Sequence, residues 1–414
     1  MTRLRRLLRA SLVLGAIALS QPALAGQSEE ATAAPPVRRP LALGMSLLSS
    51  LESEPTHLSS VPPETGRMAL TFGYNRPRRR STFEIAGSSV VPYSSGVRRE
   101  LLSFGGGVQV SRIFGRRTQF TASQSVSEAP FDLSGFAGRT PSYAASDTMA
   151  VPLTTNGSLT VERELRYDGA MTLTRTLSRR SSAALSFVHT GSMRPGVPAA
   201  TSQLGAARFS RRVSPSVIFL AGYGFGVASF ASGDREAGRR HDIDLGFSFE
   251  RPLPFSGRTL FSAGTGSTVL TDGRTHRLRL VASGTLSRDL GRAWSSRIAY
   301  SRPMHYIAGF RQPFLSDALS VSLDGRVRRT WFLSGASGFA RGAVGFATGG
   351  PAYDSYSASV RLQRQIARAW RVEAEGFLMH FAFAGADLDG AALPPLLRRR
   401  GVRFGISWAT ADYR

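Results

Sequence analysis

Few side chains in this sequence have the type and spacing that catalysis needs. His241 precedes Asp242 and Asp244, and a histidine beside carboxylates can activate water by general acid–base chemistry. The same residues also suit the polar end of a β-strand that enters from a loop at Arg239-Arg240. We favour this second interpretation, because no serine or further acid–base group accompanies the histidine in a known catalytic spacing.

A second pair of carboxylates, Glu373 and Glu375, is spaced for one face of an extended strand. None of the six histidines belongs to an HExxH motif, and neither GxSxG nor GxxxxGKS/T occurs. The chain has no cysteine, which excludes disulfides, thiolate metal sites and cysteine nucleophiles. We therefore expect no catalytic residue, no metal and no other cofactor, and interpret the chain as a protein other than an enzyme.

The charge is strongly basic, with a formal value of +24 over 414 residues, and every basic residue is arginine. Such an excess can indicate nucleic-acid binding. Here the arginines are spread over turns and strand faces without a compact basic domain, and an export signal precedes them. Arginines at a membrane rim can pair with lipid phosphates, and arginines inside a pore favour anions. We expect membrane lipid, including lipopolysaccharide, as a partner, and no nucleic acid.

Residues 1–25 have the three parts of a secretory signal peptide. Four arginines in MTRLRRLLR precede an apolar stretch from Ala10 to Ser20, and Ala23-Leu24-Ala25 provides a small-x-small cleavage site. The apolar stretch is too short to span a bilayer as a helix. Cleavage after Ala25 removes four arginines and no acid, so the charge falls from +24 to +20. A Pro- and Ala-rich linker over 26–38 follows.

From residue 39 onward, apolar and polar side chains alternate. In DIDLGFSFE, residues 242–250, Ile243, Leu245, Phe247 and Phe249 share one face of an extended chain, and the acidic and small residues share the other. The same alternation continues in segments of about ten residues, which is typical of transmembrane β-strands. Further segments contain Leu41 to Leu47, Met68 to Tyr74, Val217 to Val227, Leu278 to Leu286, Leu319 to Leu323 and Val402 to Trp408.

A nine-residue hairpin frame repeats along the chain. It reads LSRDLGRAW at 286–294 and LQRQIARAW at 362–370, two further stretches fit it, 209–217 and 110–118, and FERPL at 249–253 matches its first half. These tight links alternate with longer ones, which we place at 128–155, 304–315 and 383–398. Short turns on one side and long loops on the other are typical of outer-membrane barrels, in which the short side is periplasmic. The frame then puts five arginines at the periplasmic rim: Arg112, Arg211, Arg251, Arg288 and Arg364.

These observations predict an all-β protein: one antiparallel transmembrane barrel over 39–409, followed by a tail at 410–414. Following the links gives about 16 to 18 strands, with Trp294 and Trp370 starting two of them. Residues 150–178 fit either one long strand or two short ones. A secreted β-sandwich should divide into domains with visible linkers, and a solenoid should show a shorter, stricter repeat. Neither feature occurs.

The chain resembles Gram-negative outer-membrane β-barrel proteins of the porin type. Its final segment, GVRFGISW, is similar to the C-terminal signal by which such barrels engage their assembly machinery, with Phe404, Ile406 and Trp408 on one face. It departs from that pattern because ATADYR follows the last aromatic residue. The hairpin frame is loosely similar to barrels that accompany exopolysaccharide export or the PEP-CTERM system. That likeness implies periplasmic export components as partners.

A barrel of this size cannot be filled by its own side chains, so the interior holds water or a plug, for which 128–155 is the candidate loop. We predict a passive pore or export conduit for anionic solutes or polysaccharide. The rival hypotheses are a barrel that conducts nothing and anchors an envelope partner, and a rim-located enzyme. Taking the leucine face as lipid-facing, we expect the following side chains to line the pore: Arg277, Arg279, Arg297, Arg361, Arg371, Arg403, Asp242, Asp244, Glu373 and Glu375. Among these, Arg277 and Arg279 should form a permanent anion attractor, unless acids on neighbouring strands neutralise them.

Overall fold

The computed structural model describes most of the chain beyond residue 40. The described residues are 41–52, 66–92, 102–132, 158–195, 197–230, 238–249, 258–272, 275–302, 304–305, 314–344, 352–384 and 396–410. The predicted signal peptide, the linker and residues 411–414 of the tail lie outside this set, as does most of the candidate plug loop 128–155. Within the described residues, no helix is long and apolar enough to cross a membrane.

All described elements are β-strands. The strands of the first half are β1 (Leu41–Glu52), β2 (Gly66–Arg78), β3 (Ser81–Pro92), β4 (Ser103–Phe114), β5 (Thr118–Asp132), β6 (Ser158–Ser178), β7 (Ser181–Arg194), β8 (Val197–Arg212) and β9 (Val217–Phe230). The strands of the second half are β10 (Gly238–Phe249), β11 (Thr259–Asp272), β12 (Thr275–Leu290), β13 (Trp294–Arg302), β14 (Met304–His305), β15 (Phe314–Arg328), β16 (Trp331–Val344), β17 (Ala352–Gln365), β18 (Trp370–Ala384) and β19 (Leu396–Ala409).

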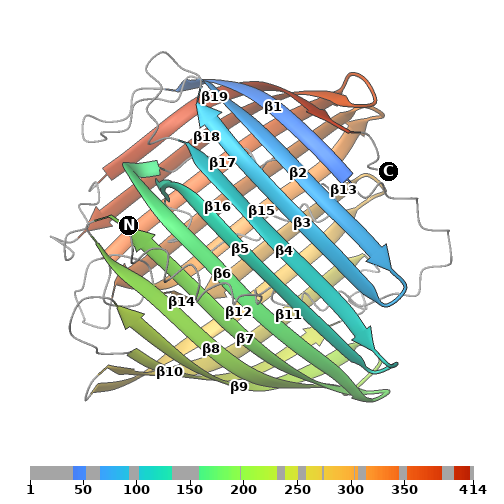
Figure 1. Ribbon diagram of the computed structural model, residues 1–414, viewed down its shortest axis with the longest axis vertical. Helices are drawn as coiled ribbons and strands as arrows, with labels where there is room; N and C mark the ends of the chain where they lie inside the picture. The colour runs from blue at the N-terminus through green and yellow to red at the C-terminus, as the bar shows by residue number, and fades with distance from the viewer. Residues whose placement is uncertain are drawn as a thin grey trace, which may run out of the picture.

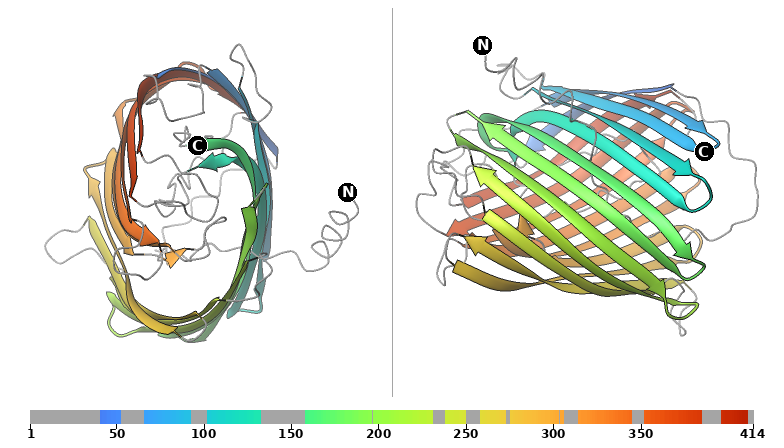
Figure 2. Two further views of the ribbon diagram at one scale, coloured as in Figure 1. Left: turned by 90° about the vertical axis from the view of Figure 1, so that its left-hand side faces the viewer. Right: turned by 60° about the horizontal axis from the view of Figure 1, so that its bottom comes forward.

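These strands form one closed barrel. Each strand pairs antiparallel with its chain neighbours, and β1 pairs with both β2 and β19, which closes the sheet. Both β13 and β14 pair with β15, so they form one interrupted position and the barrel has 18 positions. The strands run obliquely in Figure 1 and form an oval ring in the left panel of Figure 2. The predicted all-β antiparallel barrel is confirmed.

The structure decides between the two alternatives that the sequence left open for residues 150–178, one long strand or two short ones. Residues 158–178 form a single strand, β6, of 21 residues, rather than two short strands. It pairs with β5 on one side and β7 on the other, through register shifts near Pro130 and near Thr176. A strand this long reaches beyond the ten or so residues that a tilted strand needs to cross a bilayer.

Seven described connections at one end of the barrel, here called the short-turn end, are tight turns: 79–80, 115–117, 179–180, 213–216, 291–293, 329–330 and 366–369. All four hairpins of the nine-residue frame lie here, in two turn types. Gly115 and Gly291 open three-residue turns at φ of 64° and 80°, a region that glycine enters without strain. The other two are four-residue turns with matching hydrogen bonds, in which Val213 N–H donates to Val217 O and Ile366 N–H donates to Trp370 O.

The opposite end has the longer connections, but the alternation is not strict. Residues 195–196 and 273–274 link β7 to β8 and β11 to β12, and both are as short as the turns of the other end. The long segments 53–65, 133–157 and 385–395 also connect strands at this end. At the short-turn end, the connection between β10 and β11 spans nine residues, 250–258, so the expected pattern of short and long sides holds for most connections and fails at three.

The two faces of the sheet differ in the way that DIDLGFSFE predicts. Ile243, Leu245 and Phe247 of β10 are 47%, 49% and 51% exposed, whereas Asp242 is 6% exposed. Register continues this apolar face onto both neighbours, since Phe247 lies opposite Phe219 of β9 and Ala263 of β11. Large apolar side chains are likewise exposed on every other residue of most strands. The exposed face is the outer surface of the barrel, and the opposite face points inward.

Candidate pore wall

The candidate site is the inward face of the barrel. Nine of the ten predicted pore-lining side chains lie on that face, because each alternates along its strand with the exposed apolar residues of the outer face. The tenth, Arg277, lies in β12 with its backbone paired to Leu270, but its side chain is outside the described set. The register gathers most of the others into two clusters on separate arcs of the wall.

The first cluster lies on β8 to β11. Arg208 of β8 reaches across β9 to Asp244 of β10, with Nε at 3.1 Å and Nη2 at 2.8 Å from Oδ2. Gly222 lies between them in register. A Cβ at position 222 would stand 2.8 Å from Cγ of Arg208, closer than van der Waals contact allows. The absence of a side chain on β9 is therefore what lets the ion pair form across two strands.

Asp242 forms the buried part of the same cluster. Its Oδ1 accepts a hydrogen bond from Arg240 Nε at 2.8 Å and another from Thr268 Oγ1 at 2.7 Å. Arg240 lies two residues before Asp242, so the two side chains project from the same face of β10. The predicted loop at Arg239-Arg240 is wrong, because β10 begins at Gly238 and includes both residues. Two donors thus satisfy the Oδ1 atom of this buried carboxylate in place of water.

We expect Gly222→Ala to destabilise the barrel by about 1–3 kcal/mol, because the new methyl group displaces the Arg208 side chain and breaks its contact with Asp244. Gly264 of β11 is the matched control, since a Cβ there would meet only Ser283 Oγ at 3.4 Å. Gly264→Ala should be neutral or stabilising by up to about 1 kcal/mol, because alanine restricts the unfolded chain. Urea unfolding in lipid vesicles measures both. Equal effects would contradict the steric argument.

The second cluster lies on β17 to β19. Register places Arg361 of β17 opposite Glu375 of β18, and Glu375 opposite Arg403 of β19. Arg361 Nη2 lies 3.7 Å from Glu375 Oε1, and the Arg403 guanidinium lies 4.0 Å from the centre of the Phe377 ring. Below this row, Gln363 donates a hydrogen bond to Glu373 at 3.0 Å. The cluster is thus a basic–acidic–basic row with a second carboxylate beside it.

The remaining predicted residues lie between or beside these clusters. Arg279 of β12 is opposite Thr268, and Arg297 of β13 has Nη2 at 3.5 Å from Thr285 Oγ1. Arg371, the second residue of β18, lies opposite Gln365 and Ser407. Sequence reasoning missed three partners, Arg208, Arg240 and Gln363. Arg240 could have been found from its spacing to Asp242, but the others depend on register between strands.

The three histidines among the described side chains do not face this wall. Each lies on the outer face beside a tyrosine, in the pairs Tyr167–His189, Tyr223–His241 and Tyr356–His380, with ring centroids 5.2, 6.2 and 4.5 Å apart. His241 Nδ1 is 2.7 Å from Tyr223 Oη, not beside Asp242 or Asp244. Amphipathic rings of this kind are enriched where a membrane meets water. The described residues also contain no group of three potential metal ligands.

The outer face shows two such boundaries. Trp294, Trp331 and Trp370 begin strands at the short-turn end, and the Tyr–His pairs lie towards the other end. Trp370 and His380 are both on the outer face of β18, ten residues apart. At about 3.4 Å per residue and a tilt of about 40°, this corresponds to roughly 26 Å, the height of the apolar band of an outer-membrane barrel.

The predicted rim arginines lie at the short-turn end where they are described. Arg112, Arg211, Arg288 and Arg364 stand within the last three residues of β4, β8, β12 and β17, whereas Arg251 lies outside the described residues. Phe404, Ile406 and Trp408 share the outer face of β19, opposite Ser49, Leu47 and Met45 of β1. They therefore form part of the seam that closes the barrel. Their role as an assembly signal stays a prediction.

A closed antiparallel barrel with an outward apolar band satisfies every backbone group while facing lipid, which open sheets cannot do. The protein is an integral β-barrel of the outer membrane of a Gram-negative bacterium. No family model matches the sequence, and no curated protein matches it.

Solved structures that are similar over most of this chain include two siderophore receptors and OccAB4. The siderophore receptor PirA from Pseudomonas aeruginosa is similar at 10% identity, with 90% of this chain and 81% of the other covered and a TM-score of 0.44. OccAB4 from Acinetobacter baumannii is similar at 10% identity, with 91% and 99% covered and a TM-score of 0.45. The siderophore receptor PirA from Acinetobacter baumannii is similar at 8% identity, with 90% and 81% covered and a TM-score of 0.45.

Proposed function

We propose that this barrel is a passive conduit for anionic solutes, acidic polysaccharide included. The observation that carries the proposal is the charge of the inward face between the turns, where arginines outnumber carboxylates. The described inward arginines are Arg67, Arg166, Arg194, Arg208, Arg240, Arg279, Arg297, Arg361, Arg371, Arg399 and Arg403. The described inward carboxylates are Glu84, Glu164, Asp168, Asp242, Asp244, Asp324, Glu373 and Glu375.

The pairing of the inward carboxylates with hydrogen-bond donors supports anion passage more strongly than the excess of arginine over carboxylate does. The inward carboxylates of the two clusters are held by donors, Asp244 by Arg208, Asp242 by Arg240 and Thr268, and Glu373 by Gln363. Carboxylates held in this way present little free negative potential to a passing ion, and the excess of arginine then sets the sign of the field. Arginine keeps its charge at any physiological pH, so the preference should not depend on pH.

The barrel's size fits a conduit. Eighteen strands enclose a space that their own side chains cannot fill, unlike eight-stranded barrels. Extended polysaccharides and small anions both fit a wall of mixed but net basic charge. A barrel that conducts nothing and only anchors a partner remains the rival, and conductance separates the two hypotheses.

The test is the reversal potential across a salt gradient in a planar bilayer. We expect an anion-selective wild type, and we expect Arg279→Gln/Arg297→Gln to lower the anion-to-cation permeability ratio about two-fold or more, since two inward charges are removed. Arg302→Gln/Arg341→Gln is the matched control, because it removes two charges from the outer face. Cation selectivity of the wild type would contradict the proposal. No conductance would favour the anchor.

Acidic polysaccharide is tested in the same apparatus. An oligogalacturonate added to one side should reduce the single-channel current of the wild type at lower concentration than a neutral dextran of the same length. The double variant should lose most of that difference. Equal blocking by the two sugars would restrict the conduit to small anions.

A further inference from the structure

The short-turn end carries an unusual charge. Over the seven turns and the three residues on either side of each, the described residues contain a single carboxylate, Asp289. The same stretches contain arginine in every turn region: Arg76, Arg78, Arg79, Arg80, Arg112, Arg116, Arg117, Arg179, Arg180, Arg211, Arg212, Arg288, Arg292, Arg326, Arg328, Arg329, Arg364, Arg368 and Arg371. These arginines form a belt at the short-turn end, here called the belt. Repulsion among their charges is unfavourable unless anions lie against them.

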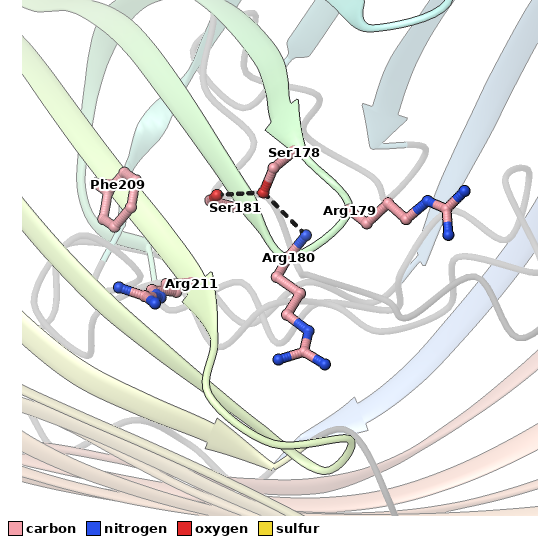
Figure 3. A pocket seen from close by; sticks show the side chains of 6 residues that line it. All are labelled: Ser178, Arg179, Arg180, Ser181, Phe209 and Arg211. Carbon is pink, nitrogen blue, oxygen red and sulfur yellow. Dashed lines mark hydrogen bonds between the residues drawn. The ribbon is translucent and has the colours of Figure 1, made fainter.

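One part of the belt forms a pocket. It has a volume of about 480 Å³, opens to the surface and lies between the β6–β7 turn and the end of β8. Figure 3 shows its lining, which is Ser178, Arg179, Arg180, Ser181, Phe209 and Arg211. The two serine hydroxyls are 2.6 Å apart, and the Arg180 backbone N–H donates to Ser178 Oγ at 3.2 Å. These bonds hold the turn in a defined shape.

The pocket lies where the apolar band ends. Register pairs Arg211 with Ser181, and Phe209 lies two residues further along β8 on the same outward face, where it is 40% exposed. Phe209 lies opposite Ala183, and the outward residues that follow on β7, Leu185 and Phe187, are exposed apolar side chains. A molecule in the pocket would thus touch guanidinium and hydroxyl groups at one end and the apolar band at the other.

The chemistry of the lining selects an oxyanion. Figure 3 shows Arg180 and Arg211 on either side of the serine pair, with Arg179 on the adjacent turn position. No described carboxylate pairs with any of these three guanidinium groups. Arginine binds phosphate oxygens through its planar fork, and serine hydroxyls supply further donors. A free oxyanion would make no favourable contact with the Phe209 ring. A phosphate that carries an acyl chain would contact both the polar lining and this ring.

We propose that this pocket binds the headgroup of an anionic glycerophospholipid, such as phosphatidylglycerol, with an acyl chain lying along Phe209. Short turns face the periplasm in outer-membrane barrels, so the lipid belongs to the inner leaflet. A zwitterionic headgroup is disfavoured, because its ammonium would approach three arginines. The site does not depend on whether the barrel conducts, and it gives the rim arginines a specific lipid ligand.

The test uses the full-length barrel in detergent, with native mass spectrometry to count bound lipid. Phosphatidylglycerol, phosphatidylethanolamine and inorganic phosphate are added separately, and phosphate is also added together with phosphatidylglycerol as a competitor. We expect the wild type to retain phosphatidylglycerol about ten-fold better than phosphatidylethanolamine. Arg179→Gln/Arg180→Gln/Arg211→Gln should lower that retention ten-fold or more. The matched control, Arg116→Gln/Arg117→Gln/Arg292→Gln, removes the same charge from other turns and should lower it less than two-fold.

Three results would overturn the proposal. Equal loss in the two triple variants would mean that the belt attracts lipid by diffuse charge alone. Displacement of phosphatidylglycerol by inorganic phosphate at equal concentration would make the pocket a free phosphate site. No preference between the two lipids in the wild type would leave no anionic site at all. Phe209→Ser adds a readout that needs no arginine change, since it should weaken phosphatidylglycerol retention while leaving phosphate binding unchanged.

Discussion

Replacing Val321 by arginine should lower the folding stability of the barrel by about 2–4 kcal/mol, which is the cost of an arginine at the bilayer midplane on the lipid face. Val321 is exposed on the outer face of β15 and lies opposite Ile298 and Ser337. It stands midway between two polar boundaries. Four residues towards one end, Asp317 accepts a hydrogen bond from Tyr300, and four residues towards the other, the Trp294 ring covers Gly325.

The matched variant is Ser320→Arg, on the adjacent residue of the same strand. Ser320 faces inward and lies opposite Ala299 and Gly338, so a new arginine would meet no like charge in register. We expect it to cost less than about 1 kcal/mol. Folding into lipid vesicles, followed by the heat-dependent shift of the folded band in gel electrophoresis, measures both. Equal losses would show that the faces are assigned wrongly or that β15 does not contact lipid.

The sequence predicted the fold because a transmembrane strand has a period of two that each segment displays by itself. Ile243, Leu245 and Phe247 show which face of β10 meets lipid without any knowledge of the neighbouring strands. Closure followed from the length of the alternating region, since a sheet of this size in lipid cannot leave an edge unpaired. The same argument placed Arg279, Arg361 and Arg403 on the inward face.

The partners of the inward charges could not be predicted, because they depend on register. Asp244 and Arg208 are 36 residues apart, and they meet only because β9 pairs with both of their strands and has glycine at position 222. The sequence left open whether Arg277 and Arg279 are an anion attractor or are neutralised by Asp242, Asp244, Glu373 or Glu375. In the structure the described partners of Asp242 and Asp244 are Arg240 and Arg208. The expected alternation of short and long connections also failed in places, since 195–196 and 273–274 at the long-loop end are as short as the turns of the opposite end.

The charged row on β17 to β19 has the largest consequence for stability. Arg403 and Glu375 are 1% and 2% exposed, and register puts them side by side. Burial of two charges costs several kcal/mol, which their mutual attraction and the contact of Arg403 with Phe377 offset. Arg361 contributes from the other side at 3.7 Å, a distance too long for a strong hydrogen bond. Glu375 therefore depends on both arginines.

Replacing Arg403 by methionine should cost about 3–5 kcal/mol, because methionine fills the space over Phe377 but leaves the buried Glu375 carboxylate with one distant cation. Adding Glu375→Gln to that variant removes the stranded charge and should restore at least half of the loss, although each single change is destabilising. A double-mutant cycle of urea unfolding in vesicles then gives a coupling free energy of about 1–3 kcal/mol between the two positions. Additive losses in the double variant would mean that Arg403 stabilises the barrel by packing on Phe377 alone, and that the row is not an electrostatic unit.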